Sequence, residues 1–182
     1  DFMSGPVGDN TARASGVIAS AGGGGKVLSQ EWKGWNTISS VNPGGYDSWS
    51  DVGSASQTIT PTAAGSSILI NCGITTGATD TGSWKVLGDI DGAGYNILFE
   101  GATDGSRAKS SMGTAFEFTS EGMRTLHGPW LWTPSYTLTD VLTVKFQISG
   151  SGSRYLNRVS STTNANYCTT GYSTIVLQEI GA

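Results

Sequence analysis

The sequence predicts an all-β fold, an antiparallel β-sandwich or jelly roll of about 8–10 strands that follows an irregular N-terminal arm. Short apolar or alternating segments recur between clusters of turn-forming residues. Glycine occurs 27 times in 182 residues, and charged residues make up only 13% of the chain. Frequent tight turns and a surface built from hydroxyls and amides are typical of extended structure and suit a helical bundle poorly.

The strand prediction rests on alternation and on the turn residues between the segments. In VLTVKFQI (141–148), apolar residues from Leu142 to Ile148 alternate with polar ones, so one face should be buried and the other exposed. The other predicted strands are KVLSQEW (26–32), SQTIT (56–60), SILINCGI (67–74), WKVLGDI (84–90), YNILFE (95–100), TAFEFT (114–119), RYLNRV (154–159) and STIVLQEI (173–180). Segment 102–113 is predicted as a polar loop and 120–137 as a long aromatic connection.

The chain is predicted to hold one domain, residues 26–182, preceded by a glycine-rich arm or linker, residues 1–25. The glycines before Lys26 do not form a phosphate-binding loop, because Ser20 stands at the first glycine position and Val27 replaces the required Ser or Thr. The chain begins with Asp1 rather than Met, so we expect a processed product or part of a longer protein.

The charge and hydropathy of the chain argue against two classes of partner. The net charge is −4, and the ten basic residues are scattered, whereas nucleic-acid binding needs clustered Lys and Arg. No apolar run approaches the roughly 20 residues that cross a bilayer. We therefore expect neither nucleic-acid binding nor membrane insertion.

Residues that could support catalysis or bind a metal are few. His127 is the only histidine, and no Gly-x-Ser-x-Gly motif accompanies it. Glu117 and Glu121 could be imagined as a carboxylate pair, but Glu117 alternates with two phenylalanines as an outward strand position would. Cys72 and Cys168 lack the spacing of a zinc site. We expect a protein that is not an enzyme and needs no metal or cofactor.

Two structural alternatives remain open for the cysteines. Cys72 and Cys168 could form a disulfide if their strands are neighbours, or they could be two buried free thiols. Sequence separation does not decide between these, because only the geometry of the folded chain does.

The stretch DIDGAGYNILFE (89–100) has two interpretations. Carboxylates at its first and third positions, glycine at the sixth and glutamate at the twelfth match a twelve-residue calcium loop. Ala93 and Ile97, however, stand where oxygen ligands belong, and strand-like segments flank the stretch. A β-hairpin that turns at Asp91–Gly94 accounts for the same residues, and we favour it.

The aromatic connection offers the strongest candidates for ligand contact. His127, Trp130, Trp132 and Tyr136 lie close together in HGPWLWTPSYT, and exposed aromatic faces stack on sugar rings. These four residues are our candidate glycan or receptor contacts. The alternative, which we favour for the two tryptophans, is burial in the sandwich core or in a subunit interface. Trp84 is predicted to be buried.

Several blocks of the sequence resemble the C-terminal β-sandwich domain of virion fibre and decoration proteins of tailed bacteriophages. The blocks are GGGKVLSQ (23–30), SQTITPTAAGSSILI (56–70), VLTVKFQI (141–148), RYLNR (154–158), NANY (164–167) and TGYSTIVLQEIGA (170–182). They follow the order of the family and span most of 26–182. HGPWLWTPSYT is longer and more aromatic than the short Asp-x-Pro turn that is usual there.

The resemblance implies a jelly-roll-like fold, a homotrimer and exposure on the virion without catalysis. It also implies that Tyr155, Asn157 and Arg158 belong to a structural motif that fixes sheets or subunits, which we favour over the alternative that these polar residues bind a ligand. The expected function is therefore that of a trimeric fibre head or capsid-decoration module. Such a module would bind other virion proteins and host-surface glycans, or serve in virion assembly. The alternative is a carbohydrate-binding module or lectin of cellular origin, since sandwich folds host both functions.

Overall fold

The structure is a computed structural model that describes residues 15–17, 25–78, 82–102, 105, 109–114, 123–159 and 170–182. For 15–17 and 112–114 it describes the backbone alone. The strands are β1 (Ser15–Val17), β2 (Val27–Trp35), β3 (Ser39–Val41), β4 (Gly45–Ile59), β5 (Ser67–Gly77), β6 (Gly82–Ile90), β7 (Asn96–Ile97), β8 (Met112–Thr114), β9 (Met123–His127), β10 (Trp130–Trp132), β11 (Leu142–Gly150), β12 (Arg154–Leu156) and β13 (Ser173–Ile180).

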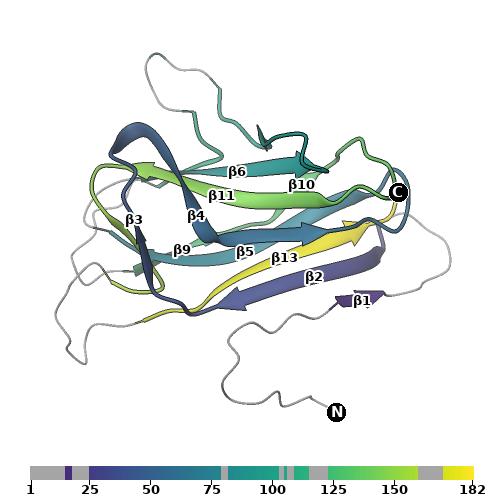
Figure 1. The fold of residues 1–182 in the computed structure, drawn as a ribbon, viewed down its shortest axis with the longest axis horizontal. Coiled ribbons are helices and arrows are strands. Elements are labelled where there is room, and N and C mark those ends of the chain that lie inside the picture. The colour runs from purple at the N-terminus through teal and green to yellow at the C-terminus, as the bar shows by residue number, and fades with distance from the viewer. Residues whose placement is uncertain are drawn as a thin grey trace, which may run out of the picture.

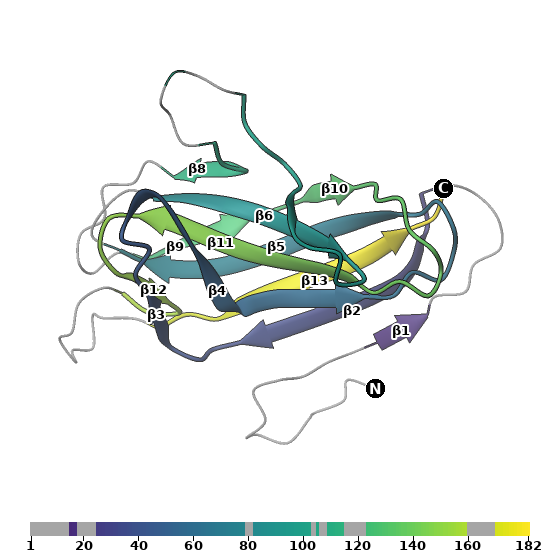
Figure 2. The ribbon, with the colours of Figure 1, turned by 45° about the horizontal axis from the view of Figure 1, so that its top comes forward.

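These strands form two antiparallel sheets that pack face to face, so the predicted all-β sandwich is confirmed (Figures 1 and 2). The large sheet has the order β1-β2-β13-β5-β12-β3, and β9 and β10 pair with β5. The small sheet has the order β4-β11-β6-β7, and β8 pairs with β6. Both views place β3 and the C-terminus at opposite ends of the sandwich.

The core lies between the two sheets and follows the alternation of the sequence. In β11, Leu142, Val144, Phe146 and Ile148 are all buried, as the pattern predicts. The inward residues of β5 are Ile68, Ile70, Cys72 and Ile74, and those of β13 include Ile175 and Leu177. Trp84 of β6 is also buried, which confirms the prediction for that residue.

Some strand predictions differ from the structure. β4 begins at Gly45, whereas the predicted strand begins at Ser56. The register of β4 against β11 shifts between Lys145 and Gln147, and this irregularity lets the glycine-containing strand stay paired. The predicted strand 95–100 is reduced to β7. The predicted connection 120–137 contains β9 and β10, because both segments pair with the edge of β5 that β13 leaves free.

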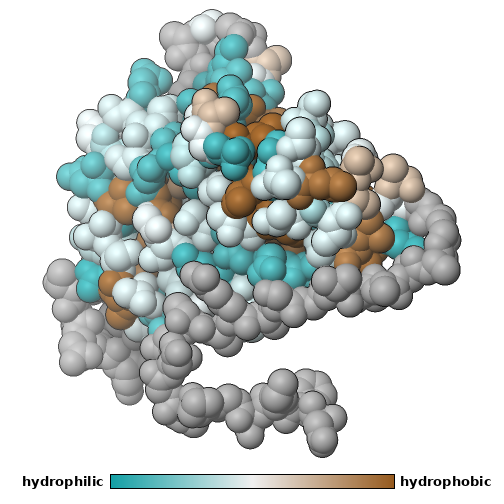
Figure 3. Space-filling view, turned by 45° about the vertical axis from the view of Figure 1, so that its right-hand side comes forward, coloured by the Kyte–Doolittle hydropathy of each residue, from teal (hydrophilic) through white to brown (hydrophobic). Residues whose placement is uncertain are grey.

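Much of the described surface is only weakly polar. On the side that Figure 3 turns forward, pale residues dominate, and apolar residues form separate patches between them. The exposed large apolar side chains include Leu131, Leu138 and Val141, which all belong to β10 and the connection to β11.

Candidate functional site

The two tryptophans of the aromatic connection face the core. Trp130 is half-buried, and its ring centroid lies 6.3 Å from that of Phe99 and 6.3 Å from that of Phe146. Trp132 is also half-buried against the core, and a Cβ added at Gly88 would come within 3.0 Å of its ring. Leu131 points the other way and is exposed. β10 therefore alternates as a strand should, with both indoles on its inner side.

The other two candidate glycan contacts have different surroundings. Tyr136 is half-buried, and its hydroxyl donates to the carbonyl oxygen of Ala63 at 2.6 Å and accepts from the N–H of Ser66 at 3.0 Å. It therefore anchors the loop between β4 and β5. His127, at the end of β9, is exposed. The structure thus gives three of the four candidates packing contacts against the core and leaves His127 at the surface.

Asn157 is the most connected polar residue of the predicted motif. Its side-chain N–H₂ donates to the carbonyl oxygens of Trp35 and Thr37, at 3.2 Å each, and its oxygen accepts from the hydroxyl of Ser173 at 2.5 Å. Its backbone N–H donates to the carbonyl oxygen of Thr75. Asn157 therefore joins β2, β5 and β13 where β13 begins, and it is fully buried.

The predicted orientation of this motif is wrong in one respect. The predicted strand 154–159 would place Tyr155 and Asn157 on one face, because side chains alternate along a strand. β12 instead ends at Leu156, and Asn157 has a positive φ of 57°. Asparagine tolerates this left-handed conformation better than most residues do, because its short side chain can bond locally. The turn directs the Asn157 side chain inward.

Arg158 and Tyr155 line a hollow at the β3 end of the sandwich. The guanidinium carbon of Arg158 lies 4.4 Å from the centroid of the Tyr155 ring. The hollow has a volume of about 240 Å³, and its walls also include Ile38, Ser39 and Ser40. Ser39 and Ser40 belong to β3, which pairs with β12. Because Ser40 pairs with Tyr155, the hollow joins a cation, an aromatic ring and a hydroxyl on one face.

A second buried polar residue, Glu179, lies near the other end of β13. Its carboxylate accepts hydrogen bonds from the hydroxyl of Ser29, from the N–H and hydroxyl of Thr62 and from the N–H of Ala63, at 2.8–3.0 Å. Burial by itself would raise the pKa of Glu179, but these hydrogen bonds together hold it below its usual range. We did not predict this role. The sequence signal for it was a charged residue at the end of the inward row that holds Ile175 and Leu177.

The stretch 89–100 forms the predicted hairpin. β6 pairs back onto β7, and the N–H of Ala93 donates to the carbonyl oxygen of Ile90. Asp91 and Gly92 both have positive φ, at 51° and 77°, which is the geometry of a type I′ turn. The carboxylate of Asp89 accepts from the N–H groups of Gly92 and Gly94, so its oxygens order the turn.

The outer face of the small sheet carries a charged and aromatic cluster. The Asp51 carboxylate accepts from the ammonium of Lys145 at 2.9 Å and from the side-chain amide of Gln147 at 2.8 Å. The hydrogen bond from Lys145 is the main cause that lowers the pKa of Asp51. Lys145 also lies 3.8 Å from the ring centroid of Tyr95. The Lys145 ammonium therefore covers one face of the Tyr95 ring in a cation–π contact.

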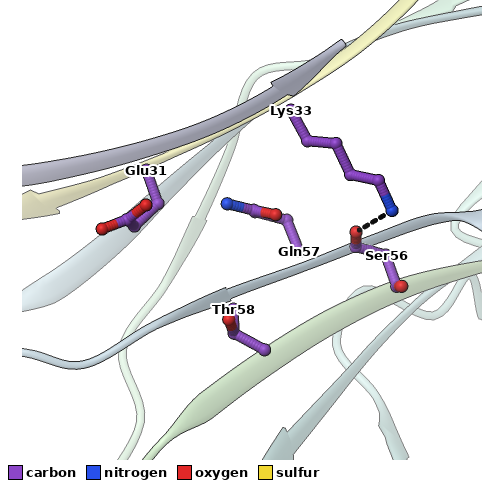
Figure 4. Close-up of a pocket in the computed structure, with 5 residues that line it drawn as sticks. All are labelled: Glu31, Lys33, Ser56, Gln57 and Thr58. Atoms are coloured by element: carbon purple, nitrogen blue, oxygen red, sulfur yellow. Dashed lines mark hydrogen bonds between the residues drawn. The ribbon is translucent and has the colours of Figure 1, made fainter. Parts of the chain in front are cut away.

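A polar cleft separates β2 from β4, the neighbouring strand of the other sheet (Figure 4). Glu31 and Lys33 of β2 and Ser56, Gln57 and Thr58 of β4 line about 170 Å³. The ammonium of Lys33 donates to the carbonyl oxygen of Ser56 at 3.3 Å and so ties the two sheets together at this edge. The dashed line in Figure 4 marks this bond.

Cys72 lies in the core as a free thiol, whose sulfur is 3.7 Å from the carbonyl oxygen of Leu126. Burial raises its pKa to about 12. Cys168, Glu117 and Glu121 lie outside the described residues. Over the described part of the chain, no group of three His, Cys, Asp or Glu side chains could hold a metal ion. No helix there is long and apolar enough to span a membrane.

Comparison with known proteins adds no family assignment. No protein-family model and no curated protein matches the chain.

Proposed function

We propose that this chain is a non-enzymatic binding module of a tailed-phage virion. It would act as a trimeric, jelly-roll-like fibre head or capsid-decoration domain that attaches to host-surface glycans or serves in virion assembly. Three copies held together would make weak individual contacts avid, because the second and third contacts form at high effective concentration.

The observation that carries the proposal is how the blocks of the resemblance meet in space. SQTITPTAAGSSILI supplies Thr62 and Ala63, and the closing block supplies Glu179, which accepts their hydrogen bonds. RYLNR supplies Asn157, which accepts from Ser173 of the same closing block. Thr62 and Ala63 lie more than a hundred residues before Glu179, and Asn157 lies 16 residues before Ser173, so three blocks depend on one another through polar contacts. Such coupling is expected of residues that define a fold, and it supports treating the blocks as one signature.

Immunogold labelling tests the setting of the module. An antibody raised against the chain should decorate tail fibres or the capsid of the phage whose genome encodes the chain. Labelling only of host cells, with none on purified particles, would contradict the proposal. It would favour the lectin or carbohydrate-binding module of cellular origin, which the hollow beside Arg158 and Tyr155 suits equally well.

A further inference from the structure

We propose that the hollow between β3 and β12 binds a sugar unit that bears a carboxylate. This site, lined by Ile38, Ser39, Ser40, Tyr155 and Arg158, is called the acid-sugar site below. The inference rests on the proposed glycan attachment and names its ligand class and its location.

The charge that would select an acid comes from Arg158. Its guanidinium is always ionised, and a planar fork of N–H donors matches the geometry of a carboxylate. No carboxylate of the described residues pairs with Arg158. Its Nε is buried and has no hydrogen-bond partner among the residues that the structure describes. The Arg158 side chain as a whole is only half-buried and lines the hollow, so its guanidinium can meet an anionic acceptor that enters there.

The Arg158 side chain is held in place before any ligand arrives. One face of its guanidinium stacks on the ring of Tyr155 at 4.4 Å, and its backbone forms a bridge with Thr170. Asn157, the preceding residue, is tied to β2 and β13 by its side chain. A cation fixed in this way loses little freedom on binding, which favours affinity from few contacts.

The remaining walls favour a sugar over a simple anion. Ser40 pairs with Tyr155 and so lies on the same face, where its hydroxyl can donate and accept, as sugar hydroxyls require. Tyr155 and the exposed side chain of Ile38 add an apolar surface for the ring carbons. The hollow has a volume of about 240 Å³, and the Ile38 and Ser40 side chains on its wall are exposed, so the terminal unit of a glycan can reach it.

The test uses NMR on the full ¹⁵N-labelled chain, with methyl β-glucuronide as the probe and methyl β-glucoside as the neutral match. The arginine Nε–H signal that Arg158→Gln removes identifies Arg158. We expect methyl β-glucuronide to shift this signal in a saturable way and methyl β-glucoside to leave it unchanged. Added salt should weaken the binding, because the main contact is ionic. Acetate at the same concentrations is the control for charge alone, because it carries the carboxylate without the sugar ring.

The variants make the assignment to this site specific. Arg158→Gln should weaken methyl β-glucuronide binding, measured by calorimetry, by about tenfold or more. Arg124→Gln, which removes the same charge from an exposed position on β9, should leave it unchanged. If Arg158→Gln lowers the melting temperature strongly, Ser40→Ala at an exposed serine replaces it. That variant should weaken glucuronide binding and leave the effect of acetate unchanged.

Three results would overturn the inference. The first is that neither methyl β-glucuronide nor the methyl glycoside of N-acetylneuraminic acid shifts the Arg158 Nε–H signal. The second is that acetate shifts this signal as much as methyl β-glucuronide does. The third is that Arg158→Gln binds methyl β-glucuronide as tightly as the wild type does. In each case immunogold labelling of virions would still test the proposed phage setting independently. Acid-sugar binding by a chain absent from virions would instead retain the site and refute its phage setting.

Discussion

The carboxylate of Glu179 accepts a hydrogen bond of 2.9 Å from the backbone N–H of Thr62, 117 residues earlier in the chain. Glu179 ends the inward row of β13, and Thr62 lies in the loop that joins β4 to β5. One side chain therefore holds the connection between the small and the large sheet. This contact leads to the first two predictions.

Replacing Glu179 by Gln should lower the free energy of unfolding by about 1–3 kcal/mol, because a buried amide N–H₂ would then face the donors of Thr62 and Ser29. Urea unfolding at pH 7 measures this loss. Glu100→Gln is the control, since Glu100 is exposed and pairs with the exposed Lys109, so its effect should stay within about 0.5 kcal/mol. Equal effects of the two changes would refute the structural role of Glu179.

The lowered pKa of Glu179 also predicts how stability depends on pH. A carboxyl with a lower pKa in the folded than in the unfolded state stabilises the fold above its ordinary pKa of 4.5. That stabilisation is lost as the pH falls through the lower value. The difference in urea midpoint between the wild type and Glu179→Gln should therefore be largest near pH 7 and shrink below pH 4.5. A difference that grows on acidification would contradict the lowered pKa.

Replacement of Asn157 by alanine or by glycine should destabilise the fold. Asn157→Ala leaves the carbonyl oxygens of Trp35 and Thr37 without their donor and keeps a side chain at positive φ. Asn157→Gly loses the same bonds but relieves the left-handed backbone, by about 1 kcal/mol. Both variants should be less stable than the wild type in urea, and alanine should be the worse of the two. The reverse order would show that φ is not positive at this position.

The inward packing of Trp132 predicts the effect of a single methyl group at Gly88. A Cβ there would lie 2.6 Å from Leu98 and 3.0 Å from the Trp132 ring, so Gly88→Ala should cost about 1–3 kcal/mol of stability. Gly53→Ala in β4 is the matched control, because its Cβ meets nothing within 4 Å. Thermal unfolding measures both variants. If Gly88→Ala is as stable as Gly53→Ala, Leu98 and Trp132 do not pack against Gly88 of β6 as closely as the structure shows.

Alternation in the sequence was enough to predict the central strands. β11 and β13 bury the residues that a period of two selects, and β13 runs from Ser173 to Ile180 as predicted. The hairpin could also be predicted from Asp-Gly, although its turn begins at Ile90, one residue before the predicted start at Asp91. Each of these features depends on neighbouring residues alone.

The features that were missed depend on tertiary pairing. β9 and β10 are strands because they pair with β5, and Trp130 faces inward because Phe146 of the other sheet packs against it. The left-handed conformation of Asn157 could not be predicted, because the surrounding sequence is typical of a strand. Its hydrogen-bond partner Trp35 is also far away in the sequence. The candidate glycan platform was drawn from composition, which does not reveal the side of a strand on which an aromatic ring lies.

Light scattering coupled to size exclusion tests the central claim, a trimeric virion module, most directly. The chain has a mass of 18.8 kDa, so a trimer has about three times that mass, and the proposed avidity depends on it. We predict that the full chain elutes with the mass of a trimer over a wide range of dilution. A stable mass of 18.8 kDa in dilute solution would contradict the account.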